Sequence, residues 1–154
     1  MCSRSFSPRS RAFTVVDALI AFLVLSIGGI SLAASLPTLA RSAAMADENS
    51  KATQLAARMI EQLRLARFEN LNYSTLRGLG LVDEWSGSGP YTFTNIAVDG
   101  SIGFSPAKAL KNGKGEIEIR DVNVNLKTVV VRIRWTAASR ASRIVELETA
   151  VGRY

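Results

Sequence analysis

A long apolar run near the N-terminus dominates the hydrophobic pattern of the chain. From Phe13 to Leu36, 24 residues are almost all apolar or small, and Asp17 is the one charged residue among them. A helix needs roughly 20 residues to cross the hydrocarbon core of a bilayer. The run therefore predicts a transmembrane helix over residues 13–37, preceded by a polar, Ser/Arg-rich leader over residues 1–12.

Three residues in or next to the run disfavour an unbroken helix. Gly28 and Gly29 stand within it, and Pro37 follows its end. Relative to alanine, glycine destabilises a helix interior by about 1 kcal/mol and proline by about 3 kcal/mol. One interpretation is close packing and a kink, which are common in membrane helices. The other is a weak stretch over residues 28–37 that partly unwinds when the helix leaves the bilayer.

After Pro37 the pattern becomes that of an amphipathic helix. Apolar residues recur at intervals of three and four positions: Ala52, Leu55, Met59, Leu63 and Ala66. Charged and polar residues lie between them, which indicates a single apolar stripe facing a core. We expect this helix to occupy residues 38–70 outside the membrane and to end near Phe68–Asn72.

Residues 71–154 have the pattern of a β-sheet domain. A turn cluster, SGSGP, covers residues 86–90. Alternating and β-branched stretches predict four strands, over residues 91–98, 115–122, 128–136 and 144–151. A sheet with one apolar face needs a partner, and the amphipathic helix supplies it. The predicted fold class is α+β: a long N-terminal helix, transmembrane and then amphipathic, packed on a C-terminal antiparallel β-sheet.

The last two strands predict a hairpin. One antiparallel register places charge pairs on one face and apolar pairs on the other: Arg134 with Glu146, Arg132 with Glu148, Ile133 with Leu147, and Trp135 with Val145. A slip of one residue would turn apolar side chains to water. Each charge pair would contribute roughly 0.2–1 kcal/mol. The predicted connection is residues 136–143.

The composition shows an excess of basic residues and lacks the residue types used most often in metal binding and acid–base catalysis. The net charge is +6, and Arg4, Arg9 and Arg11 precede the apolar run. Basic residues in that place orient a membrane segment with its N-terminus in the cytoplasm. The chain has one cysteine, Cys2, and no histidine, so the usual metal ligand and the commonest general base are missing. We expect no metal and no cofactor.

No pattern favours an enzyme. Asp83 and Glu84 are adjacent, and adjacent residues do not face one another on regular structure, so a solvated turn is the simpler interpretation. The serines have no histidine to activate them. Calcium binding by Asp99, near Gly100 and Asp83, would have too sparse a set of oxygen ligands.

A basic loop offers a weak pattern for nucleic-acid binding. Lys108, Lys111 and Lys114 lie in a glycine-containing segment. They would contact DNA if the protein belonged to a filament that takes up DNA, and such contacts would weaken with salt. A solvated loop is the simpler interpretation.

Asp17 needs an explanation, because a carboxylate at the centre of a membrane helix costs about 2.5–3.5 kcal/mol on insertion scales. Asp17 could lie at the membrane interface and stay hydrated. Alternatively, cleavage just before Phe13 would create a positive α-amino group about one helical turn away. In an assembly, the amine of one subunit could meet Asp17 of its neighbour.

The N-terminal segment RAFTVVDALIAFLVLSIGGISLA resembles that of type IV prepilins and type II secretion pseudopilins. Their pattern is a basic leader, then Gly, Phe, Thr, two aliphatic residues, Glu and an unbroken apolar helix. ALIAFLVLSIGGISLA is especially similar to the PilV class of minor pilins and to the related minor pseudopilin GspI. The close resemblance covers residues 11–35.

The resemblance implies roles for three positions. Ala12 matches the residue before the bond that prepilin peptidase cuts, and Phe13 matches the new N-terminus that this peptidase methylates. Asp17 matches the family's glutamate, which is thought to pair with the N-terminal amine of a neighbouring subunit. Ala12 stands where the family usually has glycine, and Asp17 is one methylene shorter than glutamate.

The function implied is that of a minor pilin. Such a subunit crosses the inner membrane once, with its C-terminal domain in the periplasm, and after cleavage helps to initiate a type IV pilus at or near its tip. The implied partners are prepilin peptidase, other major and minor pilins, the inner-membrane assembly platform and membrane lipid. One alternative is a minor pseudopilin of a type II secretion or competence system. From another class, the alternative is a single-pass membrane-anchored or secreted periplasmic binding protein, with a signal peptide cut near Ala34 in the secreted case.

Overall fold

A computed structural model describes residues 14–83, 85, 87 and 89–153 of the chain. The long helix comes first and two short helical segments follow it: α1 (Val15–Leu65), η1 (Phe68–Asn70) and α2 (Tyr73–Gly78). The remaining elements are β1 (Tyr91–Phe93), η2 (Ile102–Phe104), α3 (Pro106–Ala109), β2 (Lys114–Asn123), β3 (Leu126–Thr136) and β4 (Ser142–Gly152). The contacts divide the chain into two units, Met1–Ala40 and Arg41–Tyr154, so α1 contributes residues to both.

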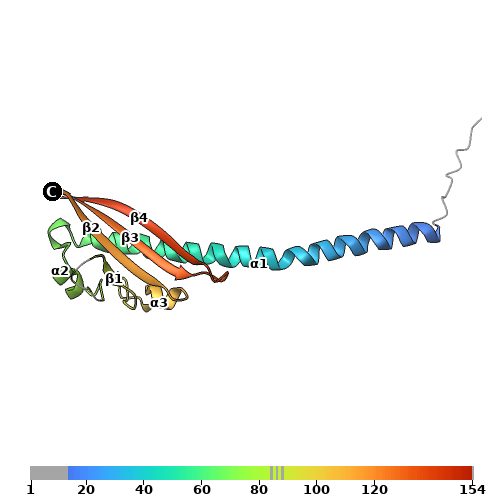
Figure 1. The fold of residues 1–154 in the computed structure, drawn as a ribbon, viewed down its shortest axis with the longest axis horizontal. Coiled ribbons are helices and arrows are strands. Elements are labelled where there is room, and N and C mark those ends of the chain that lie inside the picture. The colour runs from blue at the N-terminus through green and yellow to red at the C-terminus, as the bar shows by residue number, and fades with distance from the viewer. Residues whose placement is uncertain (1–13, 84, 86, 88, 154) are drawn as a thin grey trace, which may run out of the picture. The chain divides into compact units, whose positions relative to one another are not determined.

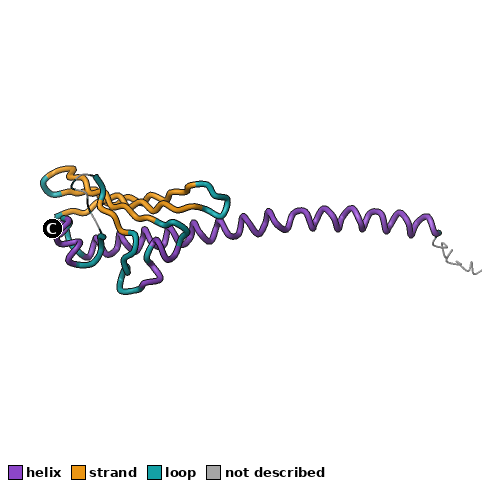
Figure 2. The backbone as a smooth tube through the Cα atoms, turned by 60° about the horizontal axis from the view of Figure 1, so that its bottom comes forward, coloured by secondary structure: helices purple, strands orange, loops and turns teal. Residues whose placement is uncertain are grey.

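The second unit is an α+β domain, as the sequence predicts. Its strands form one antiparallel sheet in the order β1-β2-β3-β4 (Figure 1). One face of the sheet is lined by buried apolar side chains, among them Ile117, Val129, Val131, Ile133 and Trp135. The part of α1 that belongs to this unit runs along that face (Figure 2), and its buried residues are Ala52, Leu55, Ala56, Met59 and Leu63. The predicted apolar stripe is thus confirmed.

Polar contacts fix this part of α1 to the domain. The indole N–H of Trp135 donates to the Glu48 carboxylate at 3.3 Å. Near the end of the helix, the Arg64 guanidinium donates to the hydroxyl of the buried Thr149. These bonds satisfy polar groups at the edge of the core, which would cost about 1–3 kcal/mol each if they were buried without a partner.

The helix ends earlier than the sequence predicts. α1 stops at Leu65 rather than near Phe68–Asn72, and Arg67 then has φ of 66° and ψ of 161°, outside the helical region. A residue with these dihedral angles cannot continue an α-helix. The short helix α2, which the sequence does not predict, follows, and the Asn72 side chain caps it by accepting from the Thr75 N–H at 2.9 Å.

The first predicted strand is wrong in length. Residues 91–98 were expected to be extended, but β1 ends at Phe93. The N–H groups of Thr94 and Asn95 both donate to the Asp83 carboxylate instead of to a neighbouring strand. Val98 is fully buried and forms an isolated bridge with Ser101.

The other three strands lie where the sequence predicts them, but the β3–β4 register differs by two residues. Arg132 is opposite Glu146, and Ile133 is opposite Val145. A shift of two keeps every side chain on its predicted face, so the apolar and charged faces are confirmed while the individual pairs are not. The shift arises because the connection is shorter: Thr136 pairs with Ser142, leaving a loop closed by a bond from the Ala137 N–H to the Ala141 carbonyl.

Candidate functional site

The start of α1 carries the strongest candidate site, and Asp17 lies in its first turn. The Asp17 carboxylate accepts from the Thr14 backbone N–H at 3.1 Å and from the Thr14 hydroxyl at 2.7 Å. In return, the Asp17 N–H donates to the Thr14 hydroxyl oxygen at 3.3 Å. This reciprocal pattern is a capping box, in which two side chains satisfy backbone N–H groups that the first turn leaves free. Asp17 therefore has a local structural role whether or not it also meets a cation.

Sequence reasoning missed the part of Thr14 in this arrangement. The spacing Thr-x-x-Asp from Thr14 to Asp17 is a form of the capping-box signature and was readable in the chain. The two residues that flank the implied cleavage site, Ala12 and Phe13, lie outside the described residues.

The side chains that follow Asp17 present an uncovered apolar surface. From Val15 to Leu39, the large hydrophobic side chains are each 58–78% exposed. By length and apolar composition, α1 could cross a membrane. A surface of this kind in water would be strongly unfavourable, since exposed apolar area costs about 25 cal/mol per Å². It calls for lipid or another apolar partner.

The hydroxyl groups within this apolar stretch bond to the helix itself. Ser26 donates to the Phe22 carbonyl at 2.8 Å, and Ser31 donates to the Ile27 carbonyl at 2.9 Å. Polar groups must be satisfied internally when a helix is in lipid, because no water is available there. The serines are therefore compatible with an apolar environment.

The predicted weak stretch, Gly28, Gly29 and Pro37, is helical throughout. Pro37 has no N–H, so it cannot complete the usual bond to the carbonyl four residues earlier. Nearby hydroxyls bond to other carbonyls of the same turn: Ser35 to Leu32 at 2.8 Å and Thr38 to Ser35 at 2.6 Å. Added Cβ atoms at Gly28 and Gly29 would meet nothing within 4 Å. The unwinding of this stretch stays a prediction.

The acidic residues weighed as calcium ligands have other partners. Asp83 accepts from the backbone of Thr94 and Asn95, and Asp99 pairs with Arg58 at 2.8 Å. Within the described part of the chain, no group of three or more acidic, cysteine or histidine residues could hold a metal ion. The basic residues weighed for DNA are spread over α3, a loop and the start of β2: Lys108, Lys111 and Lys114.

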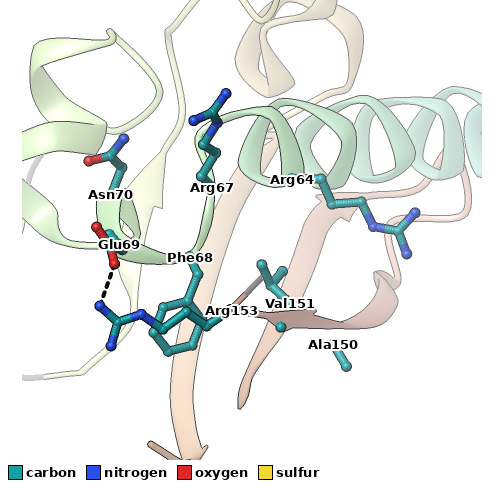
Figure 3. A pocket seen from close by; sticks show the side chains of 9 residues that line it. Arg64, Arg67, Phe68, Glu69, Asn70, Ala150, Val151 and Arg153 are labelled. Carbon is teal, nitrogen blue, oxygen red and sulfur yellow. Dashed lines mark hydrogen bonds and ion pairs between the residues drawn. The ribbon is translucent and has the colours of Figure 1, made fainter. Parts of the chain in front are cut away.

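A hollow of about 740 Å³ lies at the end of α1 beside the end of β4. Three arginines line it: Arg64, Arg67 and Arg153. Arg153 is paired with Glu69 at 2.6 Å, and Figure 3 shows the three guanidinium groups pointing in different directions. Because they do not converge, they do not form a common position for an anion.

Comparison of the chain with protein-family models, curated proteins and solved structures gives no match.

Proposed function

We propose that this chain is a minor pilin, a single-pass inner-membrane subunit that is cleaved before Phe13 and joins a type IV pilus at or near its tip, where it helps to initiate assembly. The N-terminal motif and the properties of α1 support this proposal together. Prepilin peptidase, other pilins, the assembly platform and membrane lipid are its proposed partners. A nucleic acid would be a partner only through a pilus that takes up DNA.

The observation that carries the proposal is the apolar surface of Val15–Leu39, which the chain leaves 58–78% exposed on its large hydrophobic side chains. Such a surface suits two environments in turn, the bilayer and the apolar core of a filament. The transfer between them costs little hydrophobic free energy, because both are apolar. The same apolar helix surface can therefore contact lipid in the membrane and neighbouring helices in the filament.

The capping box supports a mechanism for Asp17. Its carboxylate lies in the first turn of α1, held by two donors from Thr14. Cleavage before Phe13 would create a positive amine four residues before Asp17 along the chain. A carboxylate at a helix N-terminus is favoured by the helix dipole, and it retains acceptor capacity for one more donor. The amine of a neighbouring subunit is the donor proposed.

The experiment that tests the proposal is mass spectrometry of the chain isolated from membranes and from sheared filaments. A mature chain that begins with N-methylated Phe13 is expected in both fractions. A chain that retains its first twelve residues would indicate an uncleaved anchor, and one that begins near residue 35 would indicate a secreted protein. Either result would overturn the proposal.

The closest rival is a minor pseudopilin of a type II secretion or competence system, which would give the same mature N-terminus. The two are separated by deleting the gene. Loss of surface pili with normal protein secretion supports the pilus assignment. Loss of secretion or of DNA uptake, with surface pili intact, supports a pseudopilus.

A further inference from the structure

The two edges of the sheet differ in how they are closed. At one edge, β1 has only three residues, and the segment beside it covers them. The Asp83 N–H donates to the Thr92 carbonyl at 2.8 Å, and its carboxylate accepts from Thr94 and Asn95. At the other edge, β4 has eleven residues, and no strand among the described residues pairs with its outer side.

Two hydrogen bonds determine which backbone groups of β4 face this open edge. At one end of the hairpin, the Ala137 N–H donates to the Ala141 carbonyl. At the other end, the Arg153 N–H donates to the Asn125 carbonyl. Bonded and non-bonded pairs alternate along an antiparallel ladder, so the odd-numbered residues of β4 are bonded to β3. The even-numbered residues turn their N–H and C=O groups outward: Ser142, Ile144, Glu146, Glu148, Ala150 and Gly152.

The open edge lacks two of the features that usually protect one. Natural edge strands are interrupted by proline or by a bulge, or are covered by another segment. β4 contains no proline, and its pairing with β3 shows no register shift over eleven residues. By contrast, the β2–β3 pairing shifts between Asp121 and Asn123. The outer side of β4 is therefore able to accept another strand.

A groove of about 420 Å³ runs beside β4, between this strand and α1. Its lining is apolar at Ala57 and Ile60 of α1 and at Leu147 of β4, and polar at Glu61, Arg64, Glu148 and Thr149. Ile60 and Leu147 contact the core but are only partly buried. A strand added to β4 would point alternate side chains into this groove, and apolar side chains there would complete the burial of Ile60 and Leu147.

The other face of β4 carries Glu146 and Glu148. Glu146 is paired with Arg132 at 2.7 Å, whereas Glu148 forms no ion pair with a described cation and has only an electrostatic interaction with Arg120. A second copy of β4, paired antiparallel about Leu147, would place Glu146 opposite Glu148 twice. Like charges in opposite positions destabilise a sheet. Basic side chains on this face fit better than a second copy of the chain in that register.

We propose that the open edge of β4 binds an extended segment of another protein as an added strand. The segment alternates basic residues, which face Glu146 and Glu148, with apolar residues, which enter the groove lined by Ile60 and Leu147. Main-chain hydrogen bonds to the even-numbered residues of β4 supply affinity, and the alternation supplies specificity. The inference does not depend on the pilus assignment, since every residue it uses lies in the second unit.

The test uses the full chain in detergent micelles and three capped eight-residue peptides, one alternating Lys and Val, one alternating Glu and Val, and one alternating Lys and Ser. Binding is measured by amide NMR. The Lys/Val peptide is expected to bind and to slow hydrogen exchange at the outward N–H groups of β4. The Glu/Val peptide is expected to bind at least tenfold more weakly, because it meets the unpaired Glu148. The Lys/Ser peptide tests the groove and is also expected to bind more weakly.

Two variants at one position separate strand addition from simple charge attraction. Ala150→Pro removes an outward N–H but no hydrogen bond to β3. It should reduce the affinity for the Lys/Val peptide roughly tenfold. Ala150→Thr keeps the N–H and should bind like the native chain. If Ala150→Pro does not fold, Glu148→Lys replaces it and should reverse the preference to the Glu/Val peptide.

Three results would overturn the proposal. The first is equal binding of the Lys/Val and Glu/Val peptides. The second is undiminished binding of the Lys/Val peptide to a folded Ala150→Pro chain, or an unchanged preference in Glu148→Lys. The third is contacts between two copies of β4 in the protein without peptide, since the edge would then belong to a homodimer.

Discussion

Arg132 donates to Glu146 at 2.7 Å directly across the β3–β4 ladder, where the two residues are opposite partners. Arg132 also donates to Glu118 of β2 at 2.6 Å. One guanidinium thus joins three strands on the outer face of the sheet. The bonds from Arg120 and Arg132 lower the pKa of Glu118, and the bond from Arg132 lowers the pKa of Glu146.

These pKa shifts make stability depend on acidity. Because both folded pKa values are lower than the ordinary glutamate value, the carboxylates stabilise the fold above that value and lose this contribution as pH falls through the folded pKa values. We expect the free energy of unfolding to decrease below about pH 4.5. Urea unfolding followed by tryptophan fluorescence measures it. Replacing Glu118 and Glu146 together by Gln should flatten the dependence in this range, and an unaltered slope would contradict the assignment.

Gly115 is required by its close approach to Phe93. The two residues are opposite partners in the β1–β2 ladder, and a Cβ at Gly115 would collide with the fully buried ring. We expect Gly115→Ala to lower the free energy of unfolding by about 1–3 kcal/mol, as overpacking does. Gly103→Ala is the control, since its Cβ would meet only the Ser101 hydroxyl at 3.7 Å. Equal midpoints of denaturation for the two variants would refute this reasoning.

Capping and charge can be separated at the start of α1. Thr14→Ala removes the cap hydroxyl but leaves the Asp17 carboxylate, and it should cost the helix start about 1 kcal/mol. Asp17→Asn keeps an acceptor of similar size and removes the charge. Under the proposed function, Asp17→Asn should reduce the amount of the chain in sheared filaments much more than Thr14→Ala, and Asp17→Glu should preserve it. Immunoblots normalised to the membrane fraction measure the amount of each variant in the filaments. Equal reductions in Asp17→Asn and Thr14→Ala would mean that Asp17 acts only in capping the helix.

Pro37 should lower the local stability of α1. It removes one helix N–H bond, and the hydroxyls of Ser35 and Thr38 bond to carbonyls of the same region. We expect Pro37→Ala to slow amide hydrogen exchange around residues 33–40 by at least tenfold, as a gain of about 3 kcal/mol in helix propensity allows. Leu39→Ala, which leaves the backbone bonding intact, serves as the control. Unchanged exchange in Pro37→Ala would exclude Pro37 as a weak point.

Arg58 attaches α1 to the loop before α3. Its guanidinium pairs with Asp99 at 2.8 Å and lies over the Phe104 ring at 3.4 Å from the centroid. We expect Arg58→Ala to lower the free energy of unfolding by about 1 kcal/mol. Arg58→Lys keeps a positive charge but not the planar stacking on Phe104. It should therefore lower the free energy of unfolding by less than Arg58→Ala does. Thermal or urea unfolding checks the order, and a larger loss for lysine would contradict it.

The candidate site was predictable from the chain in part. The apolar length and the place of Asp17 are properties of consecutive residues, and so is the Thr14 capping signature. The implied cleavage positions Ala12 and Phe13 rest on the resemblance and lie outside the described residues. The open edge of β4 could not be predicted, because the alternation of apolar and polar residues along a strand is the same whether one or two strands pair with it.

The sequence by itself determined the long helix, the three long strands and the side chains of these elements that face the core. Periods of 3.6 and 2 are set by backbone geometry, so the stripe through Leu55 and Met59 and the face through Val131 and Ile133 needed no tertiary information. Only the tertiary structure decided the β3–β4 register, the early end of β1 and the asymmetry of the two sheet edges. A shift of two residues leaves a period-two pattern unchanged, so loop closure at Ala137 and Ala141 had to select the pairing. The contact of Asp83 with Thr94 likewise joins residues whose proximity no local pattern encodes.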